Sequence, residues 1–236
     1  MKPTILIAIP TMGNIRTELV ARLQDYSHVE DFRIDVRVIA NVQDHAAARN
    51  ELVMYHFTPE GYTHLLFIDA DTVPPGGFIE ALLAMKAPVA SGIAHVWRKK
   101  QANRPGPAPL PAIWHRVLQQ DGTPTYQMYG AVPKSGVLVM SDIAIGCFCM
   151  MIAADVIARL AKHLPFFKTT YLEETQEKQF SEDIYFCERV TQELGLPIAV
   201  NFDLVCGHYK TINLADVAEY GQNCVEVAEA LWQQNS

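Results

Sequence analysis

Strand-like and helix-like patterns alternate along the first 96 residues of this 236-residue chain. Apolar runs of strand length, continuous or alternating with polar residues, occur at residues 5–9, 34–40, 65–68 and 89–94. Between these runs, apolar residues recur at helical spacing in residues 15–23, 46–57 and 78–85. This order predicts an α/β fold with a mostly parallel, Rossmann-like sheet, because parallel strands are joined by helices that pack on the two faces of the sheet.

The second half of the chain, from residue 97 on, is less regular. A basic and proline-rich stretch at residues 97–111 predicts a long loop, and residues 166–180 are polar and irregular. Strands are expected at residues 145–152 and 198–205, and helices at 153–164, 181–194 and 214–232. Too little chain follows the first loop for a second large core, so we expect one domain over residues 1–236 with halves at 1–96 and 97–236.

The composition narrows the classes of protein that fit. Half of the residues are hydrophobic (50%) and 19% are charged, which is globular and excludes wholesale disorder. The net charge of −7 disfavours a surface that binds by neutralising nucleic-acid phosphates. No apolar run reaches the roughly 18 residues of a membrane-spanning helix. The first apolar stretch predicts a strand and not a signal peptide, and five scattered cysteines favour a reducing compartment, so we expect a cytoplasmic protein.

Two carboxylates, Asp69 and Asp71, directly follow the apolar run at residues 65–68. A buried strand that ends in this way places both acids at the carboxyl edge of the sheet, where ligands of such folds bind. Two neighbouring carboxylates suit a hard divalent cation that also contacts phosphate. A plain surface turn is the alternative, since Asp and Pro are common in turns.

One resemblance concerns this segment alone. Asp69-Ala70-Asp71-Thr72-Val73 looks like the nucleophile motif of haloacid-dehalogenase-type phosphatases, in which the first Asp attacks phosphate. That family carries the motif on its first strand, whereas here a strand–helix–strand–helix unit precedes it. The later Gly-Asp metal motif of that family has no convincing counterpart in this chain either.

A second resemblance extends over nearly the whole chain and begins with residues 7–11, in the first expected strand and the turn after it, and with Ala48-Arg49-Asn50 on the second expected helix. These segments resemble the GT-A fold nucleotide-sugar glycosyltransferases of the family 2 type, in which the first is the nucleotide-binding turn and the second lies near the base and ribose. Asp69-Ala70-Asp71 is similar to the family's DxD motif, which holds a divalent metal against the donor diphosphate. The family's usual acidic run after the second strand is replaced by residues 41–44, which leaves recognition of the base open.

Three later segments match the same family in the expected order. Residues 145–152 resemble the strand that floors the acceptor site, although Cys147 and Cys149 stand where small or aromatic residues are common. Ser181-Glu182-Asp183 resembles the Glu-Asp motif that supplies the base in inverting members. Gly207-His208 resembles the late histidine that completes the metal shell.

The resemblance implies a metal-dependent transfer of a sugar from a nucleoside-diphosphate sugar, UDP- or GDP-linked, to an acceptor hydroxyl with inversion. Residues 1–96 would bind the nucleotide sugar, and residues 97–236 would form the acceptor side. Mn²⁺ or Mg²⁺ would bind Asp69, Asp71 and His208. Asp183 would be the general base, kept ionised by amides at a helix N-terminus, and Glu182 would bind or orient the acceptor. The donor-binding residues would be Pro10, Thr11, Asp44, Arg49, Asp69, Ala70, Asp71 and Lys210.

Structural roles for these residues stay open in the sequence. Asp44 and Asp183 also fit plain helix-capping or first-turn positions. Arg49 and Lys210 fit solvated surface charges, and His208 fits a strand end. A non-catalytic nucleotide-sugar-binding protein and a phosphatase using Asp69 are the alternative functions. The acceptor is not indicated and could be a small molecule, a glycan or a modified macromolecule.

Overall fold

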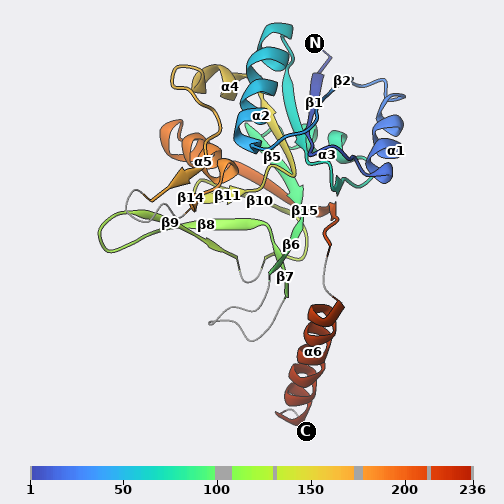
Figure 1. Ribbon diagram of the computed structural model, residues 1–236, viewed down its shortest axis with the longest axis vertical. Coiled ribbons are helices and arrows are strands. Elements are labelled where there is room, and N and C mark those ends of the chain that lie inside the picture. Colours follow the sequence, from blue (N-terminus) through green and yellow to red (C-terminus); the bar gives the residue numbers. More distant parts are fainter. Residues whose placement is uncertain (1, 99–107, 130–131, 173–177, 212–213, 235–236) are drawn as a thin grey trace.

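The computed structural model describes residues 2–98, 108–129, 132–172, 178–211 and 214–234 (Figure 1). Its centre is a seven-stranded sheet. From one edge to the other, the sheet contains β10 (Val137–Met140), β15 (Ile198–Val205), β5 (Val89–Ile93), β12 (Cys149–Ala153), β3 (His64–Ile68), β1 (Thr4–Pro10) and β2 (Arg33–Ile39). The helices are α1 (Thr17–Tyr26), α2 (His45–Glu51), α3 (Phe78–Ala84), α4 (Ala154–Leu160), α5 (Glu182–Glu188) and α6 (Leu214–Gln234).

The sheet is mixed, with five strands in one direction and two in the other. β1 pairs in parallel with β2 and β3, and β15 pairs in parallel with β5. β12 lies antiparallel between β3 and β5, and β10 is antiparallel to β15. The predicted α/β fold with a mostly parallel sheet is confirmed. Because β12, from residues 97–236, lies between β5 and β3 of residues 1–96, both halves build one domain.

The sheet separates two apolar cores, and successive strand residues enter opposite ones. Leu6 and Phe67 pack in the core that α2, α4 and α5 cover, whereas Ile7 and Leu66 pack in the core that α1 and α3 cover (Figure 1). Strand residues therefore alternate between two buried faces, which explains why the sequence shows continuous apolar runs at β1 and β3.

The predicted helices form with recognisable ends. Asp44 caps α2, since its Oδ1 accepts hydrogen bonds from the amides of Ala46 (2.8 Å) and Ala47 (3.3 Å). α2 continues as a π-helical segment, Leu52–Phe57, so that the two together cover the predicted helix. α5 continues in the same way over Arg189–Glu193 and stops before Gly195, whose φ of 64° favours glycine.

The prediction of one continuous strand at residues 145–152 is wrong, because the segment contains parts of two strands. Its start belongs to β11 (Ile143–Ile145), which lies in a three-stranded sheet with β8 (Ile113–Leu118) and β9 (Pro124–Met128). Its end is β12 of the main sheet, and residues 146–148 connect the two. The sequence shows no break because both pieces are apolar, and only their different partners separate them.

The two predicted irregular stretches contain short antiparallel ribbons. The ends of the 97–111 loop pair as β6 (His95–Arg98) and β7 (Ala108–Pro111), while residues 99–107, with most of its basic side chains, lie outside the described residues. In the 166–180 stretch, β13 (Thr170–Tyr171) pairs with β14 (Lys178–Phe180), and residues 173–177 lie outside the description.

Helix α6 extends away from the sheet (Figure 1). Its Tyr220 ring makes an edge contact with Trp97 of β6, with 5.7 Å between ring centroids. Across the ranges described above, no helix is both long enough and apolar enough to cross a membrane.

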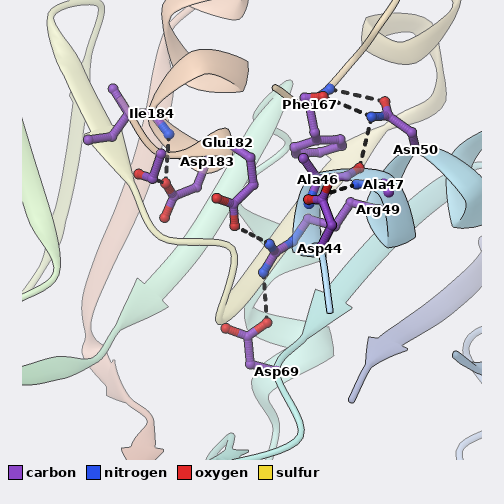
Figure 2. A network of polar contacts seen from close by, with 11 residues as sticks. Asp44, Ala46, Ala47, Arg49, Asn50, Asp69, Phe167, Glu182, Asp183 and Ile184 are labelled. Atoms are coloured by element: carbon purple, nitrogen blue, oxygen red, sulfur yellow. Dashed lines mark hydrogen bonds and ion pairs between the residues drawn. The ribbon is translucent and has the colours of Figure 1, made fainter. Parts of the chain in front are cut away.

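Asn50 of α2 ties this helix to the segment that follows α4. Its amide nitrogen donates to the carbonyls of Ala46 and Phe167, both at 2.8 Å (Figure 2). Its Oδ1 accepts from the amides of Phe166 (3.0 Å) and Phe167 (3.1 Å). The segment that leads toward α5 is therefore held at a fixed distance from α2.

We expect Asn50→Ala to lower the free energy of unfolding by about 2–3 kcal/mol, because it leaves several backbone groups of residues 166–167 without their partners. Urea denaturation measures the loss. Asn14→Ala, at an exposed position, serves as the control and changes stability by less than about 0.5 kcal/mol. Equal effects for the two variants would show that the Asn50 bonds do not hold the segment.

Candidate active site

The carboxyl ends of β1 and β3 meet at one edge of the sheet. Pro10 ends β1, and the buried Thr11 closes the following turn, with its hydroxyl donating to the Asn14 carbonyl (2.8 Å) and accepting from the Gly13 amide (3.1 Å). The carbonyl of Ala70, after β3, accepts from the Arg16 amide at 3.1 Å. The two turns are thus joined, and the Thr11 hydroxyl is used within its own turn.

Arg49 lies behind this edge and is only 3% exposed. Its Nη2 donates to Asp69 Oδ1 at 2.8 Å, and its Nη1 donates to Glu182 Oε1 (Figure 2). One arginine of α2 thereby joins the first carboxylate after β3 to the first residue of α5. Arg49 is therefore not a solvated helix charge.

The electrostatics around Arg49 keep it charged. Burial alone would lower the pKa of the guanidinium, but neighbouring acidic groups, Asp69 and Glu182 among them, outweigh burial and raise that pKa. Its Nε is buried and has no hydrogen-bond partner among the residues that the structure describes.

Asp183 follows Glu182 in the first turn of α5. Its Oδ1 accepts from the Ile184 amide (2.8 Å) and from the hydroxyl of Ser181, which stands at the N-cap position but makes no capping bond to the helix. Burial raises the pKa of Asp183, and the Glu182 carboxylate adds to the rise. The Ile184 amide favours the ionised form of Asp183, as expected, but burial is the larger effect, so the net shift of the pKa is upward.

The second oxygen of Asp183 faces Gly146, in the connection between β11 and β12. A Cβ at position 146 would lie 3.5 Å from Asp183 Oδ2 and 2.8 Å from the Phe148 ring. Glycine therefore leaves the space beside Oδ2 open. Because Oδ1 already accepts two hydrogen bonds, Oδ2 is the oxygen that suits proton transfer.

Asp71 lies on the exposed side of the same turn, 34% exposed. It contacts the short ribbon in which β16 (Gly207–His208) pairs with β4 (Thr72–Val73). Its backbone carbonyl accepts from the Tyr209 amide at 2.9 Å, and its Oδ2 pairs with the Lys210 ammonium.

His208 approaches the other oxygen of Asp71, with 3.6 Å between Nε2 and Oδ1. The Nδ1 of His208 lies 2.9 Å from the carbonyl oxygen of His95, which only accepts, so Nδ1 carries the proton. In the neutral ring, Nε2 then presents a lone pair toward Asp71.

The structure brings together two of the three residues predicted to bind metal. Nε2 of His208 and Oδ1 of Asp71 lie 3.6 Å apart, so one cation between them would contact both, and the His95 contact fixes the orientation of the ring. Asp69 is turned toward Arg49 instead. Within the described ranges, no group of three or more His, Cys, Asp or Glu side chains is assembled to hold a metal ion.

A cleft of about 700 Å³ opens between the start of α2 and the β13–β14 ribbon, a volume that suits a small molecule. The charged and polar residues in its lining include Asp44, His45, Asn50, Lys168, Lys178 and Glu182. Of the predicted site residues, Asp44 and Glu182 thus line this cleft. Asp44 therefore both caps α2 and lines the cleft.

Arg16 was not predicted from the sequence, and Gly146 was predicted only as part of the strand at residues 145–152. The Arg16 guanidinium lies 4.1 Å from the centroid of the Tyr209 ring, beside the Asp71 turn. A basic residue shortly after the β1 turn is visible in the sequence and indicates a cation near the carboxyl edge of the sheet. A single strand over residues 145–152 does not predict that Gly146 lies beside Asp183. Cys147 and Cys149 are buried, as expected for core residues.

No family model and no curated protein matches this chain. Among solved structures, A197 from STIV is 15% identical, with 88% of this chain and 86% of that chain covered and a TM-score of 0.53. GalNAc-T7, solved with UDP, GalNAc and Mn²⁺, is 8% identical, with 89% of this chain but only 44% of that chain covered and a TM-score of 0.49. A putative glucose-1-phosphate thymidylyltransferase from Bacillus anthracis, in complex with a sucrose, is 10% identical, with 84% and 86% covered and a TM-score of 0.39.

These comparisons bear on the fold alone. The likeness to A197 supports the α/β architecture, with a mixed sheet and flanking helices, over most of both chains. The TM-scores of the other two structures lie below 0.5, so these two structures support no statement about this chain. At such identities none of the three assigns a residue or a reaction to this chain.

We expect Arg49→Met to lower the free energy of unfolding by about 3 kcal/mol, because Asp69 and Glu182 lose the cation that offsets their partial burial. Chemical denaturation at neutral pH measures this loss. Arg37→Met, which removes an exposed arginine of β2, is the matched control and costs less than about 0.5 kcal/mol. A loss no larger than that of the control would contradict the central role of Arg49.

Proposed function

We propose that this protein is a metal-dependent glycosyltransferase that moves a sugar from a UDP- or GDP-sugar to an acceptor hydroxyl with inversion. The observation that carries the proposal is the bridge made by Arg49. It joins Asp69, of the proposed donor site, to Glu182, the neighbour of the proposed base Asp183. The Asp69 turn of the proposed donor site and the first turn of α5, which also carries Asp183, are thus joined by one side chain (Figure 2).

The donor would bind at the edge formed by the turns after β1 and β3. Asp71 and His208, joined by Asp69, would hold Mn²⁺ or Mg²⁺, and the bound metal supplies Lewis-acid neutralisation of the leaving diphosphate. Pro10, Thr11 and Ala70 would shape the turns, and Asp44 would face the nucleoside from the cleft. Residues 1–96 would supply most of the donor site, with His208 and Lys210 reaching it from the second half.

Asp183 would take the proton of the acceptor hydroxyl on Oδ2. The acceptor oxygen forms the new bond to the anomeric carbon, the bond from that carbon to the diphosphate oxygen breaks, and the diphosphate leaves with the electron pair. Glu182, held by Arg49, would orient the acceptor. The raised pKa of Asp183 makes it a stronger base than an ordinary aspartate, which suits this role.

A thermal-shift screen with UDP, GDP, CDP, ADP and dTDP, each with Mn²⁺, Mg²⁺ or EDTA, tests the donor site. We expect UDP or GDP to stabilise the protein only when metal is present, by about 2.7 kcal/mol at a hundred times the dissociation constant. Asp71→Asn should abolish the shift, whereas Asp25→Asn, at an exposed site on α1, should retain it. The absence of a shift with every diphosphate would contradict the proposal.

Release of the nucleoside diphosphate from the matching sugar donor tests the base. We expect Asp183→Asn to lower turnover about 10²- to 10⁴-fold while the thermal shift stays.

In the wild type, turnover should fall as the pH drops through the raised pKa of Asp183, because the protonated acid accepts no proton. The midpoint of this acid limb should lie above 3.8, the ordinary value for Asp.

Other outcomes identify the alternatives. Binding of a nucleotide sugar without turnover in the wild type would indicate a non-catalytic binding protein. A phosphoenzyme on Asp69, formed from a phosphate ester, would indicate the phosphatase mechanism instead. Turnover that survives Asp183→Asn unchanged would exclude Asp183 as the base.

A further inference from the structure

Lys210 forms an ion pair with Asp71, the carboxylate that also faces His208 in the proposed metal site. Its ammonium pairs with Asp71 Oδ2, while His208 Nε2 faces Oδ1 of the same carboxylate at 3.6 Å. Asp71 is thus already neutralised by a cation of the chain itself. Asp69 is neutralised in the same way by Arg49, so each carboxylate of the pair has its own counter-charge.

The two counter-charges differ in how easily they can be exchanged. The Arg49 side chain is 3% exposed, whereas the Lys210 side chain is 50% exposed. Exposed ion pairs of this kind contribute little to stability, so the Lys210 ammonium can leave Asp71 at small cost. The buried Arg49 pair cannot separate without leaving charges uncompensated.

The backbone around Lys210 stays in place when its side chain moves. The β16–β4 pairing and the bond from the Tyr209 amide to the Asp71 carbonyl, at 2.9 Å, fix residues 207–209 against the acidic turn. Arg16 also packs against the Tyr209 ring at 4.1 Å. Rotation of the Lys210 side chain alone therefore exposes Asp71 and leaves His208 where it is.

We propose that Lys210 competes with the divalent metal for Asp71 and moves to the donor diphosphate when the metal binds. This inference rests on the proposed donor site. Without a donor, a metal ion that binds Asp71 must displace the Lys210 ammonium and break its ion pair with that carboxylate. With a donor, the diphosphate gives the displaced ammonium an anionic partner through charge-assisted hydrogen bonds, so metal and donor strengthen each other's binding.

Mn²⁺ binding by the protein alone, followed by electron paramagnetic resonance of the free ion, tests the competition without any turnover. We expect Lys210→Gln to bind Mn²⁺ roughly twofold to fivefold more tightly than the wild type, because the competing ion pair is gone. Lys210→Arg keeps the cation and should keep the weaker binding. Lys162→Gln removes an exposed positive charge elsewhere and should leave Mn²⁺ affinity unchanged.

The same titration in saturating UDP or GDP tests the second half of the proposal. The nucleotide should raise Mn²⁺ affinity in the wild type by a larger factor than in Lys210→Gln. Circular dichroism checks that each variant is folded, and Lys210→Met replaces Lys210→Gln if the glutamine variant is not.

Two outcomes would overturn the inference. Mn²⁺ affinity in Lys210→Gln equal to or below that of the wild type would show that Lys210 does not compete. Equal enhancement by nucleotide in both proteins would show that it does not couple metal to donor. If no nucleotide binds the wild type at all, the proposed function fails, and the Mn²⁺ titration without nucleotide still decides whether Lys210 competes.

Discussion

The ion pairs of the buried Arg49 are the interaction on which the candidate site depends. A buried guanidinium is unfavourable unless carboxylates offset its lost hydration. Asp69, 20 residues further along the chain, and Glu182, 133 residues further along, provide this compensation. Because Asp69 directly follows β3 and Glu182 begins α5, their shared arginine sets the position of α5 relative to the carboxyl edge of the sheet. Asp183, the next residue of α5, is placed by the same contact.

The two acids of the Asp69-Ala70-Asp71 turn have different surroundings, although one residue separates them. Asp69 points inward to a cation that is 3% exposed, and Asp71 points outward to one that is 50% exposed. The buried contact is costly to break, whereas the exposed contact contributes little to stability. This difference suits the proposed site, in which Asp71 exchanges Lys210 for the metal while Oδ1 of Asp69 stays with Arg49.

Local patterns predicted the first half of the fold well because they depend on neighbouring residues. The strands β1, β2, β3 and β5, the helices between them and the Asp44 cap follow from periodicity and capping chemistry. The antiparallel insertion of β12 and the separation of β11 from it were not predictable in this way. An apolar strand has the same pattern in either direction, and its partners lie far away in the sequence.

The sequence by itself determined the order of strands and helices, and it determined that Asp69 and Asp71 stand at the carboxyl edge of the sheet. It also indicated which residue types there suit a diphosphate, a metal and a proton. Only the tertiary structure decided that Arg49 joins Asp69 to Glu182, that Lys210 holds Asp71, and that burial raises the pKa of Asp183. These outcomes depend on contacts between segments that are distant in the sequence, 20 residues apart for Arg49 and Asp69 and more than a hundred for Arg49–Glu182 and Asp71–Lys210, and on the water that those contacts exclude. A local pattern contains neither.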